Sequence, residues 1–196
     1  DRDTRTGVLV DPSYSPAAFA DRAREQGIRV THILNTHGHI DHVNGNDEAV
    51  ALTGAPIAGH AGLPTPPGVV LAEGDTLEVG GLRLHFLHVP GHAADHLTIY
   101  ESNFQILLTG DLIFVGKVGG TRSEADARTE WTSLQKVLAA IPDVATVWPG
   151  HDYGARPSST IGLEKATNPF LQCTDVDDFL RFKANWATFK KENGLK

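Results

Sequence analysis

The sequence of 196 residues contains a single cysteine, Cys173, and no methionine. One thiol excludes an internal disulfide and a Cys-x-x-Cys zinc ribbon. It fits a reducing compartment, and we expect a cytoplasmic protein. The missing methionine, and a polar start that leads straight into a strand, indicate that natural N-terminal residues are absent. The sequence therefore leaves a secretory leader open.

Long apolar runs and basic runs are also missing. No stretch approaches the roughly 20 apolar residues of a membrane span. The formal net charge is −7 and the basic residues are scattered, which argues against nucleic acid or an anionic membrane as a partner. A hydrophobic content of 40% is ordinary for a globular protein, and the length suits one domain with a substantial core.

Strands and helices alternate in the first half of the sequence. Ser15-Pro16 predicts a helix start, and the β-branched, apolar residues 30–36 predict a buried strand. Residues 75–110 have the pattern of a meander, with a two-residue hairpin turn at Gly80-Gly81. This order predicts an α/β (α+β) architecture of two sheets with helices outside them, rather than a simple doubly wound sheet.

The last third of the sequence predicts mainly helices. Ser123 and Asp126 have the spacing of a capping box. Residues 176–190 place aromatic side chains on one face and predict a single amphipathic helix that docks on the body. We expect one domain over residues 1–196, in which residues 156–196 form a short helical extension packed on the rest.

A dense cluster of metal-binding side chains occupies residues 36–42, which read Thr-His-Gly-His-Ile-Asp-His. Imidazole suits zinc, iron and similar ions, whereas calcium and magnesium prefer oxygen ligands. His37 and His39 are two residues apart, so at the end of an extended strand they point the same way. Asp41 and His42 follow after the chain turns and can face a different point. One short loop can therefore hold ligands for two metal ions.

Three further candidate ligands each follow a predicted strand and a glycine, namely His92, Asp111 and His151. Strand ends beside glycine are places where side chains from different segments converge on one site. The other five histidines carry weaker signals. Among them, His60 and His96 are weak candidates for the neighbourhood of the site, and we interpret the others as packing or surface residues.

Taken together, these seven residues resemble the ligand set of the metallo-β-lactamase superfamily, and the resemblance covers nearly the whole chain. It implies a four-layer αβ/βα sandwich of two mixed β-sheets flanked by helices, with metal ions at the edge between the sheets. It also implies a first metal on His37, His39 and His92, a second on Asp41, His42 and His151, and Asp111 as the bridge. The expected cofactors are two divalent ions, zinc first, with iron or manganese as alternatives.

The charge of such a centre suits hydrolysis. Five neutral imidazoles and two carboxylates carry −2, two divalent ions carry +4, and a bridging hydroxide leaves +1. This residual charge favours hydroxide near neutral pH and stabilises the oxyanion that forms when hydroxide attacks a carbonyl. We therefore expect Asp41 and Asp111 to be catalytic carboxylates as well as ligands.

Two segments narrow the resemblance to one branch. Residues 160–171, and the run Gly-His-Asp-Tyr at residues 150–153, resemble glyoxalase II (hydroxyacylglutathione hydrolase)-like proteins and persulfide dioxygenases. The first group implies a binuclear thioesterase, with Tyr153 at a position that contacts glutathione. A thiolate leaving group, with a conjugate-acid pKa of about 8.5, needs no strong general acid. Asp111 stands where the best-known zinc β-lactamases place a cysteine, which makes a β-lactamase the weaker interpretation.

Three alternatives stay open. The resemblance to persulfide dioxygenases implies a single iron on the positions of His37, His92 and Asp111, a two-His, one-carboxylate triad suited to O₂ chemistry. A lactonase or another ester hydrolase of the same superfamily is the next. A binding or interaction protein that keeps the ligands without turnover is the non-enzymatic alternative.

The loop after Asp111 departs from both groups. Residues 115–122 read Val-Gly-Lys-Val-Gly-Gly-Thr-Arg, where glyoxalase II enzymes have Gly-Cys-Gly followed by Arg or Lys and the dioxygenases have Gly-Arg-Thr-Asp-Phe. Lys117 is a candidate for the lysine that contacts glutathione in glyoxalase II, and equally for a solvated loop charge. The expected partner is a small thioester, glutathione-linked under the first interpretation, and a homodimer is compatible with the sequence.

Overall fold

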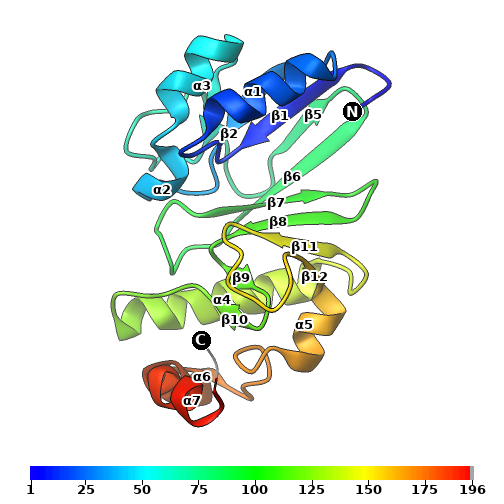
Figure 1. Cartoon of the computed structure of the whole chain (residues 1–196). Helices are drawn as coiled ribbons and strands as arrows, with labels where there is room; N and C mark the ends of the chain where they lie inside the picture. Colours follow the sequence, from blue (N-terminus) through cyan, green and yellow to red (C-terminus); the bar gives the residue numbers. More distant parts are fainter. Residues whose placement is uncertain (195–196) are drawn as a thin grey trace.

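The computed structural model describes residues 1–194. Two large β-sheets pack face to face, and helices cover their outer sides (Figure 1). Helices α1 (Pro16–Glu25) and α3 (Asn46–Thr53) lie outside the first sheet, and α4 (Glu124–Ala140) lies outside the second. The predicted architecture of two sheets flanked by helices is therefore confirmed. Within residues 1–194, no helix combines the length and the hydropathy needed to cross a bilayer.

The first sheet is parallel throughout its described strands. It has the order β1 (Thr6–Val10), β2 (Arg29–Leu34), β3 (Ile57–Gly59), β4 (Val69–Val70), and all three neighbouring pairs are parallel. A mixed sheet was expected here. The first two pairs are parallel because α1 and α3 carry the chain back over the outer face between the strands. The strands consequently end at one common edge.

The second sheet is mixed. Its order is β12 (Ser159–Thr160), β11 (Thr146–Pro149), β8 (Ile106–Gly110), β7 (Leu97–Glu101), β6 (Leu82–His88), β5 (Thr76–Val79). Strands β5 to β8 form the predicted antiparallel meander, and β11 joins β8 in parallel. The hairpin turn at Gly80 has φ 61°, which glycine adopts without strain. A separate two-stranded sheet pairs β9 (Ile113–Phe114) with β10 (Lys117–Val118).

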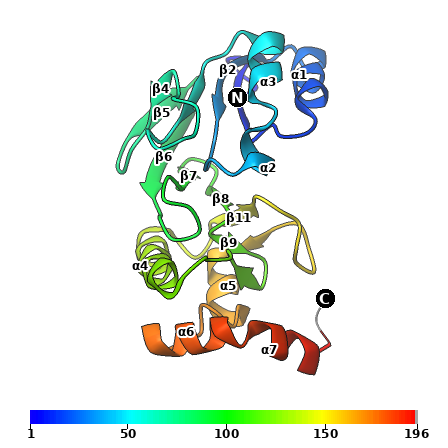
Figure 2. The same ribbon diagram turned by 90° about the vertical axis from the view of Figure 1, so that its left-hand side faces the viewer.

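The prediction of one helix over residues 176–190 is wrong. The structure has α6 (Val176–Ala184) and α7 (Trp186–Glu192), separated at Asn185. Asn185 has φ −98° and ψ 5°, and its side-chain Nδ2 donates to the Arg181 carbonyl at 2.8 Å. Asparagine is a weak helix former because its side chain competes for backbone partners in this way. Figure 2 shows both helices beyond α4 and α5 (Ile161–Thr167), at the end of the molecule opposite α1 and α3.

The two predicted helix starts differ in their capping. Ser123 caps α4 as expected, because its Oγ accepts a hydrogen bond from the Asp126 backbone N–H at 3.1 Å. Ser15 precedes α1 as expected, but its side chain makes no capping hydrogen bond. Proline at the first helical position needs no partner for an N–H group, and this contributes to the start of α1.

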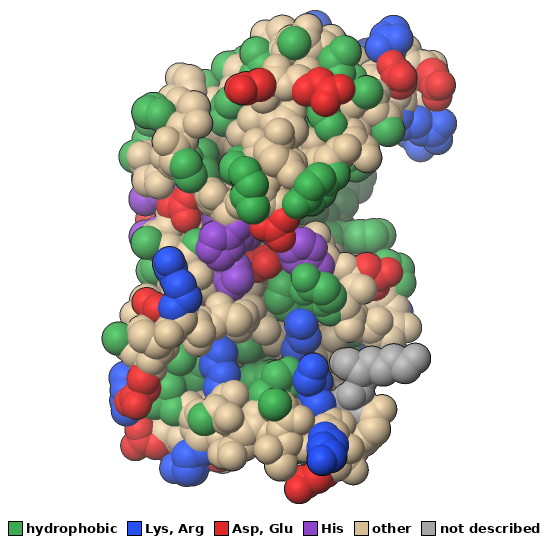
Figure 3. Space-filling model, turned by 60° about the vertical axis from the view of Figure 1, so that its left-hand side comes forward, with side chains coloured by type: hydrophobic (Ala, Val, Ile, Leu, Met, Phe, Trp, Pro, Cys, Tyr) green, Lys and Arg blue, Asp and Glu red, His purple; other side chains and the backbone are tan. Residues whose placement is uncertain are grey.

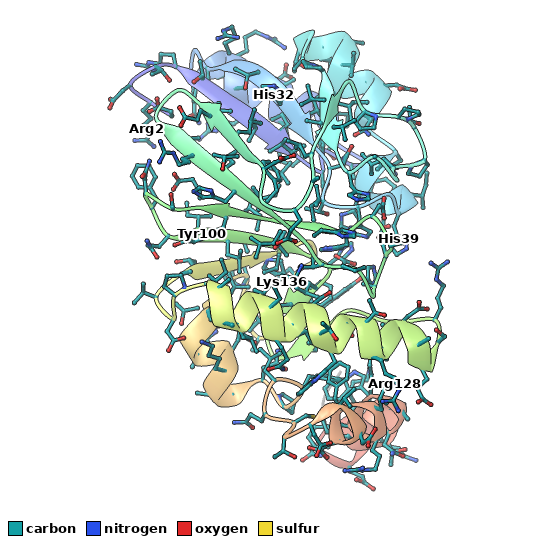
Figure 4. The ribbon with its side chains drawn as sticks, turned by 180° about the vertical axis from the view of Figure 1, so that it is seen from behind. Arg2, His32, His39, Tyr100, Arg128 and Lys136 are labelled. Carbon is teal, nitrogen blue, oxygen red and sulfur yellow. The ribbon has the colours of Figure 1, made fainter. Side chains whose placement is uncertain are left out.

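Apolar side chains fill the space on both faces of the second sheet. Between the sheets lie Leu34, Phe86, Leu97 and neighbouring residues. On the outer face, residues of β8, β11 and α4 pack with Phe170 and Phe179, so α6 shares the larger core. A hydrogen bond also connects α4 to the second sheet. Lys136 of α4 (labelled in Figure 4) donates to the carbonyl of His88, the last residue of β6, at 2.6 Å.

Replacing Phe179 by alanine tests whether α6 belongs to the cooperative core. The side chain is 0% exposed, so Phe179→Ala should lower the free energy of unfolding by about 3–5 kcal/mol. Denaturant-induced unfolding followed by circular dichroism measures this change. Phe104, which is 68% exposed, is the matched control, and its replacement should change the same quantity by less than about 0.5 kcal/mol. Equal effects would contradict a shared core.

Candidate metal centre

The seven predicted ligands lie together at the edge where the two sheets meet. His37 and His39 follow β2, and Asp41 and His42 lie on the short helix α2 (Ile40–Val43). The other three follow β6, β8 and β11, namely His92, Asp111 and His151. Figure 3 shows the histidines gathered around acidic side chains on one face of the molecule, and Figure 4 labels His39 at this edge.

The donor atoms form three compact groups, in each of which all the atoms lie within 4.8 Å of one another: His37–His39–His92, His37–His42–Asp111, and Asp41–His42–His151. The first and third groups contain the ligands that the resemblance implied for two separate ions. The second group joins them through the Asp111 carboxylate. The structure thus brings together all seven residues that the sequence selected.

The distances between donors are those of a coordination shell. His39 Nδ1 lies 2.9 Å from His37 Nε2 and 3.0 Å from His92 Nε2. On the other side of the site, His42 Nε2 lies 3.4 Å from Asp111 Oδ1, and His151 Nε2 lies 3.3 Å from Asp41 Oδ2. Metal–ligand bonds of about 2.1 Å separate neighbouring donors by about 3.0 Å in an octahedron and about 3.4 Å in a tetrahedron.

Hydrogen bonds behind the rings fix which nitrogen carries a proton. His92 Nδ1 lies 2.7 Å from the Gly120 carbonyl, which only accepts, so Nδ1 is the protonated nitrogen. The Thr36 hydroxyl donates to Asp11 at 2.6 Å and therefore accepts from His37 Nδ1 at 3.1 Å. Nε2 of His37 and Nε2 of His92 consequently both present lone pairs to His39 Nδ1. A single hydrogen on His39 Nδ1 can form a hydrogen bond with only one of these two nitrogens. A cation between the three nitrogens can accept a lone pair from each of them.

Two buried donor atoms also lack a partner within residues 1–194. His42 Nε2 and Asp111 Oδ1 make no hydrogen bond although both are buried. Buried polar atoms are normally satisfied, and these two face each other at 3.4 Å. The residues present therefore fit a pair of divalent ions with nitrogen and oxygen ligands.

The electrostatics differ between the two sides of the site. Burial and four neighbouring imidazoles hold the pKa of His37 far below its usual range. Burial also lowers the pKa of His42, but the hydrogen bond to Asp11 and the nearby Asp111 carboxylate outweigh burial and raise that pKa to about 10. For Asp111, burial raises the pKa, but the nearby imidazoles of His42, His151 and His92 lower it by more, so the carboxylate stays ionised.

Asp11 is a functional residue that sequence reasoning missed. It directly follows β1, and its Oδ2 accepts from His42 Nδ1 at 2.8 Å. Its Oδ1 accepts from the backbone N–H of Thr36 at 2.9 Å. A carboxylate behind a metal-binding imidazole fixes the orientation of the ring and raises its basicity. The sequence carries a signal, because Asp11 directly follows the apolar residues 7–10, as the other candidate ligands follow predicted strands.

His96 is closer to the site than its weak signal suggested. It is fully buried, its ring stacks on His37 with centroids 4.9 Å apart, and its Nε2 accepts from the Asp111 backbone N–H at 3.0 Å. Burial, helped by the neighbouring imidazoles, lowers the pKa of His96 to about 3, so the ring stays neutral. His96 supports Asp111 and has no lone pair left for a metal. His60 instead stacks on His88 with centroids 4.5 Å apart.

Lys117 and Tyr153, the two candidate substrate contacts, lie side by side. Lys117 Nζ stands 3.9 Å from the centroid of the Tyr153 ring, a cation–π contact. The same ring stacks on His151 with centroids 4.9 Å apart and is 58% exposed. Lys117 and Trp186 line both of two cavities of about 550 and 650 Å³. Lys117 and Tyr153 therefore lie between His151, a proposed ligand, and the cavities that Lys117 lines.

This fold and this site define a metal-binding αβ/βα sandwich protein. The chain belongs to the metallo-beta-lactamase superfamily, which it matches over residues 2–64 and 61–151. The hydroxyacylglutathione hydrolase of Rhodospirillum rubrum is 36% identical over 165 residues, which are 83% of this chain and 63% of that protein. The hydroxyacylglutathione hydrolase of Methylobacterium sp. (strain 4-46) is 32% identical over 219 residues, 89% of this chain and 85% of that protein. This chain thus spans less than two thirds of the first relative.

Two solved structures are similar to the whole arrangement. ETHE1 from Myxococcus xanthus has a TM-score of 0.86 and 30% identity, with 95% of this chain and 83% of that chain covered. TTHA1623 in a di-iron-bound form has a TM-score of 0.68 and 32% identity, with 84% and 89% covered. Both similarities cover more than four fifths of this chain.

Removing the Asp11 carboxylate should weaken metal binding, because Asp11 supports His42 directly and His37 through Thr36. Asp11→Ala deletes the acceptor behind His42, and loss of such a partner typically lowers metal affinity about 10–100-fold. Competition with a chromogenic chelator, titrated with Zn²⁺, measures both equivalents. The exposed Asp21→Ala variant is the control and should keep the parent affinities. Unchanged affinity in Asp11→Ala would show that His42 needs no orienting carboxylate.

Proposed function

We propose that this chain is a hydrolase that uses two divalent metal ions to cleave a thioester of the hydroxyacylglutathione type. The observation that carries the proposal is the set of three donor groups, in which one group shares residues with each of the others. A mononuclear site needs only one such group. Relatives with 32 and 36% identity that are named hydroxyacylglutathione hydrolase support the reaction and the substrate class.

The proposed ligands divide as the resemblance implied: His37, His39 and His92 for the first ion, Asp41, His42 and His151 for the second, and Asp111 for both. Bound there, two divalent ions would supply a nucleophile from water near neutral pH and Lewis-acid stabilisation of a developing oxyanion. The chain itself orients the two rings, because Asp11 and the Gly120 carbonyl accept from Nδ1 of His42 and His92, so that Nε2 of each ring faces the site. Zinc is the proposed metal, with iron or manganese as alternatives.

The two carboxylates have different surroundings and therefore different proposed roles. Asp111 is 6% exposed and faces imidazoles on both sides of the site, which suits a bridging ligand. The side chain of Asp41 is 38% exposed and lies 3.3 Å from His151. Asp41 is the carboxylate that incoming water can reach, so Asp41 is the proposed acceptor of the proton that water loses.

The proposed substrate contacts are Lys117 and Tyr153. A glutathione moiety carries carboxylates, and the larger cavity adds Arg156 and Lys190 to Lys117. Figure 3 shows Lys and Arg side chains on the same face as the histidines, toward the C-terminal helices. The cationic lining supports an anionic thiol portion in this region, with its thioester directed toward the metal centre.

A mono-iron persulfide dioxygenase is the second candidate. The observation that favours it is the similarity to ETHE1, which covers 95% of this chain at a TM-score of 0.86. That reaction would use His37, His92 and Asp111, which belong equally to the two-metal site. The run of residues 115–122 differs from both groups, so metal loading and reaction must decide between them.

A cytoplasmic location is proposed on the single cysteine. Burial, helped by Asp178, raises the pKa of the Cys173 thiol to about 11, which makes it a weak nucleophile.

A homodimer stays a prediction. Analytical ultracentrifugation of the purified protein would measure its oligomeric state.

Metal content and two paired assays test the reaction. We expect two metal equivalents by elemental analysis, hydrolysis of S-lactoylglutathione, and no oxygen uptake with glutathione persulfide. Asp111→Ala should lose one equivalent and reduce kcat/KM by more than the roughly 100-fold that outer hydrogen-bond partners of ligands contribute. One iron per chain with oxygen uptake and no hydrolysis would overturn the proposal. A lactone turned over faster than the thioester would indicate a lactonase, and no turnover at all a binding protein.

Lys117→Ala tests the substrate site. Loss of one charge-assisted hydrogen bond of about 1.5 kcal/mol should raise KM for the thioester about tenfold and leave kcat nearly unchanged. Steady-state kinetics at pH 7 give both constants. Lys191, an exposed lysine of α7, is the control. If KM is the same in both variants, Lys117 is a solvated loop charge.

A further inference from the structure

Glu130 on α4 is a buried carboxylate for which the proposed reaction has no use. Its side chain is 0% exposed, and its Oε2 accepts from Lys183 Nζ of α6. Within residues 1–194, its Oε1 has no hydrogen-bond partner. Burial raises the pKa of Glu130 to about 7, although Lys183 opposes the shift. Apolar residues of the same volume would avoid the desolvation cost of such a pair, so the pair requires an explanation.

Glu130 packs directly against the residue that precedes a proposed metal ligand. Gly91, with φ 140°, comes immediately before His92. A Cβ atom at Gly91 would lie 2.5 Å from the Cα atom of Glu130 and 2.6 Å from its backbone N. Real Cβ atoms do not approach so closely, so α4 and the chain before His92 are in contact at a spacing that only glycine permits.

The unpartnered oxygen of Glu130 faces the loop on the other side of His92. A Cβ atom at Gly119 would lie 3.1 Å from Glu130 Oε1 and 3.1 Å from His92 Nδ1, and would overlap the carbonyl oxygen of Asp111. The next residue, Gly120, accepts the hydrogen bond from His92 Nδ1 at 2.7 Å. This Gly119–Gly120 pair belongs to the loop whose sequence departs from glyoxalase II and from the dioxygenases.

Three segments therefore lie together around the His92 imidazole. They are α4, which carries Glu130, α6, which carries Lys183, and the Gly119–Gly120 loop in front of this ion pair. Lys183 also lines the cavity of about 550 Å³ together with Lys117 and both glycines. The ion pair thus lies between α6 and the loop whose Gly120 carbonyl accepts from His92 Nδ1.

We propose that Glu130 and Lys183 are positioning residues for the metal ligand His92, acting through the Gly119–Gly120 loop. The C-terminal helix α6 thereby contributes to the metal centre without touching it. The inference rests on the metal centre of the proposed function and not on the reaction that it performs. A parent protein that held one ion instead of two would contradict the two-metal proposal and leave this inference testable, because His92 belongs to the first group.

Zn²⁺ affinity measures the effect directly. Glu130→Gln and Lys183→Met should each weaken one of the bound Zn²⁺ equivalents about tenfold or more, as loss of an orienting partner does, in competition with a chromogenic chelator. In the Co²⁺-substituted protein, the shifted proton resonance of His92 Nδ1–H should move or broaden. Arg128→Met is the matched control, because it breaks an exposed ion pair between the same two helices, Arg128–Asp177 at 3.3 Å. It should leave both readouts unchanged.

The double variant Glu130→Met/Lys183→Met separates positioning from stability. It removes both buried charges, so its thermal midpoint should return toward that of the parent. If Glu130 and Lys183 position His92, the Zn²⁺ affinity of this variant should stay low even when its thermal midpoint recovers. The double variant therefore tests the proposal even if the single variants fail to fold. Parent-like affinity in the single variants, or affinity that recovers together with the midpoint, would overturn the proposal.

Discussion

Five imidazoles and two carboxylates aim their donor atoms at one small volume, and the rest of the fold has to hold them there. The spacing is tight enough that the donors oppose one another unless a cation lies between them. Nε2 of His37 and Nε2 of His92 both present lone pairs to His39 Nδ1, at 2.9 and 3.0 Å. Ring protons are kept on the far side by Thr36 and by the Gly120 carbonyl. The arrangement is therefore built for positive charge at its centre.

Opposite pKa shifts on neighbouring imidazoles follow from the same crowding. His37 has imidazoles around it, so burial and mutual repulsion keep its pKa low. His42 lies between the Asp11 and Asp111 carboxylates, which outweigh burial and raise its pKa to about 10. A metal ion that takes the lone pair of His42 must replace a proton there, so metal binding releases a proton on that side. Under the proposed two-metal assignment, the two ions would therefore meet different protonation states in the imidazoles that bind them.

Local pattern was enough to select the seven donors, because each follows a strand and strand ends meet at one edge. It was not enough for residues whose role depends on a distant partner. His96 matters because its Nε2 accepts the backbone N–H of Asp111, and no spacing in the sequence predicts that contact. Glu130 lies on the apolar stripe of α4, where only the fold reveals Lys183 beside it. The missed helix break at Asn185 is different, since its weak helix propensity was visible.

With a single cysteine, the chain has no disulfide between its two sheets. The donors supply another kind of link, because His37 to His42 come from the first sheet and His92, Asp111 and His151 from the second. With ions bound, these residues close loops of more than a hundred residues between His37 and His151, and closing long loops removes much of the freedom of the unfolded chain. The two halves of the sandwich are then fastened by coordination bonds. Metal supply in the cell would therefore govern how long the folded chain persists.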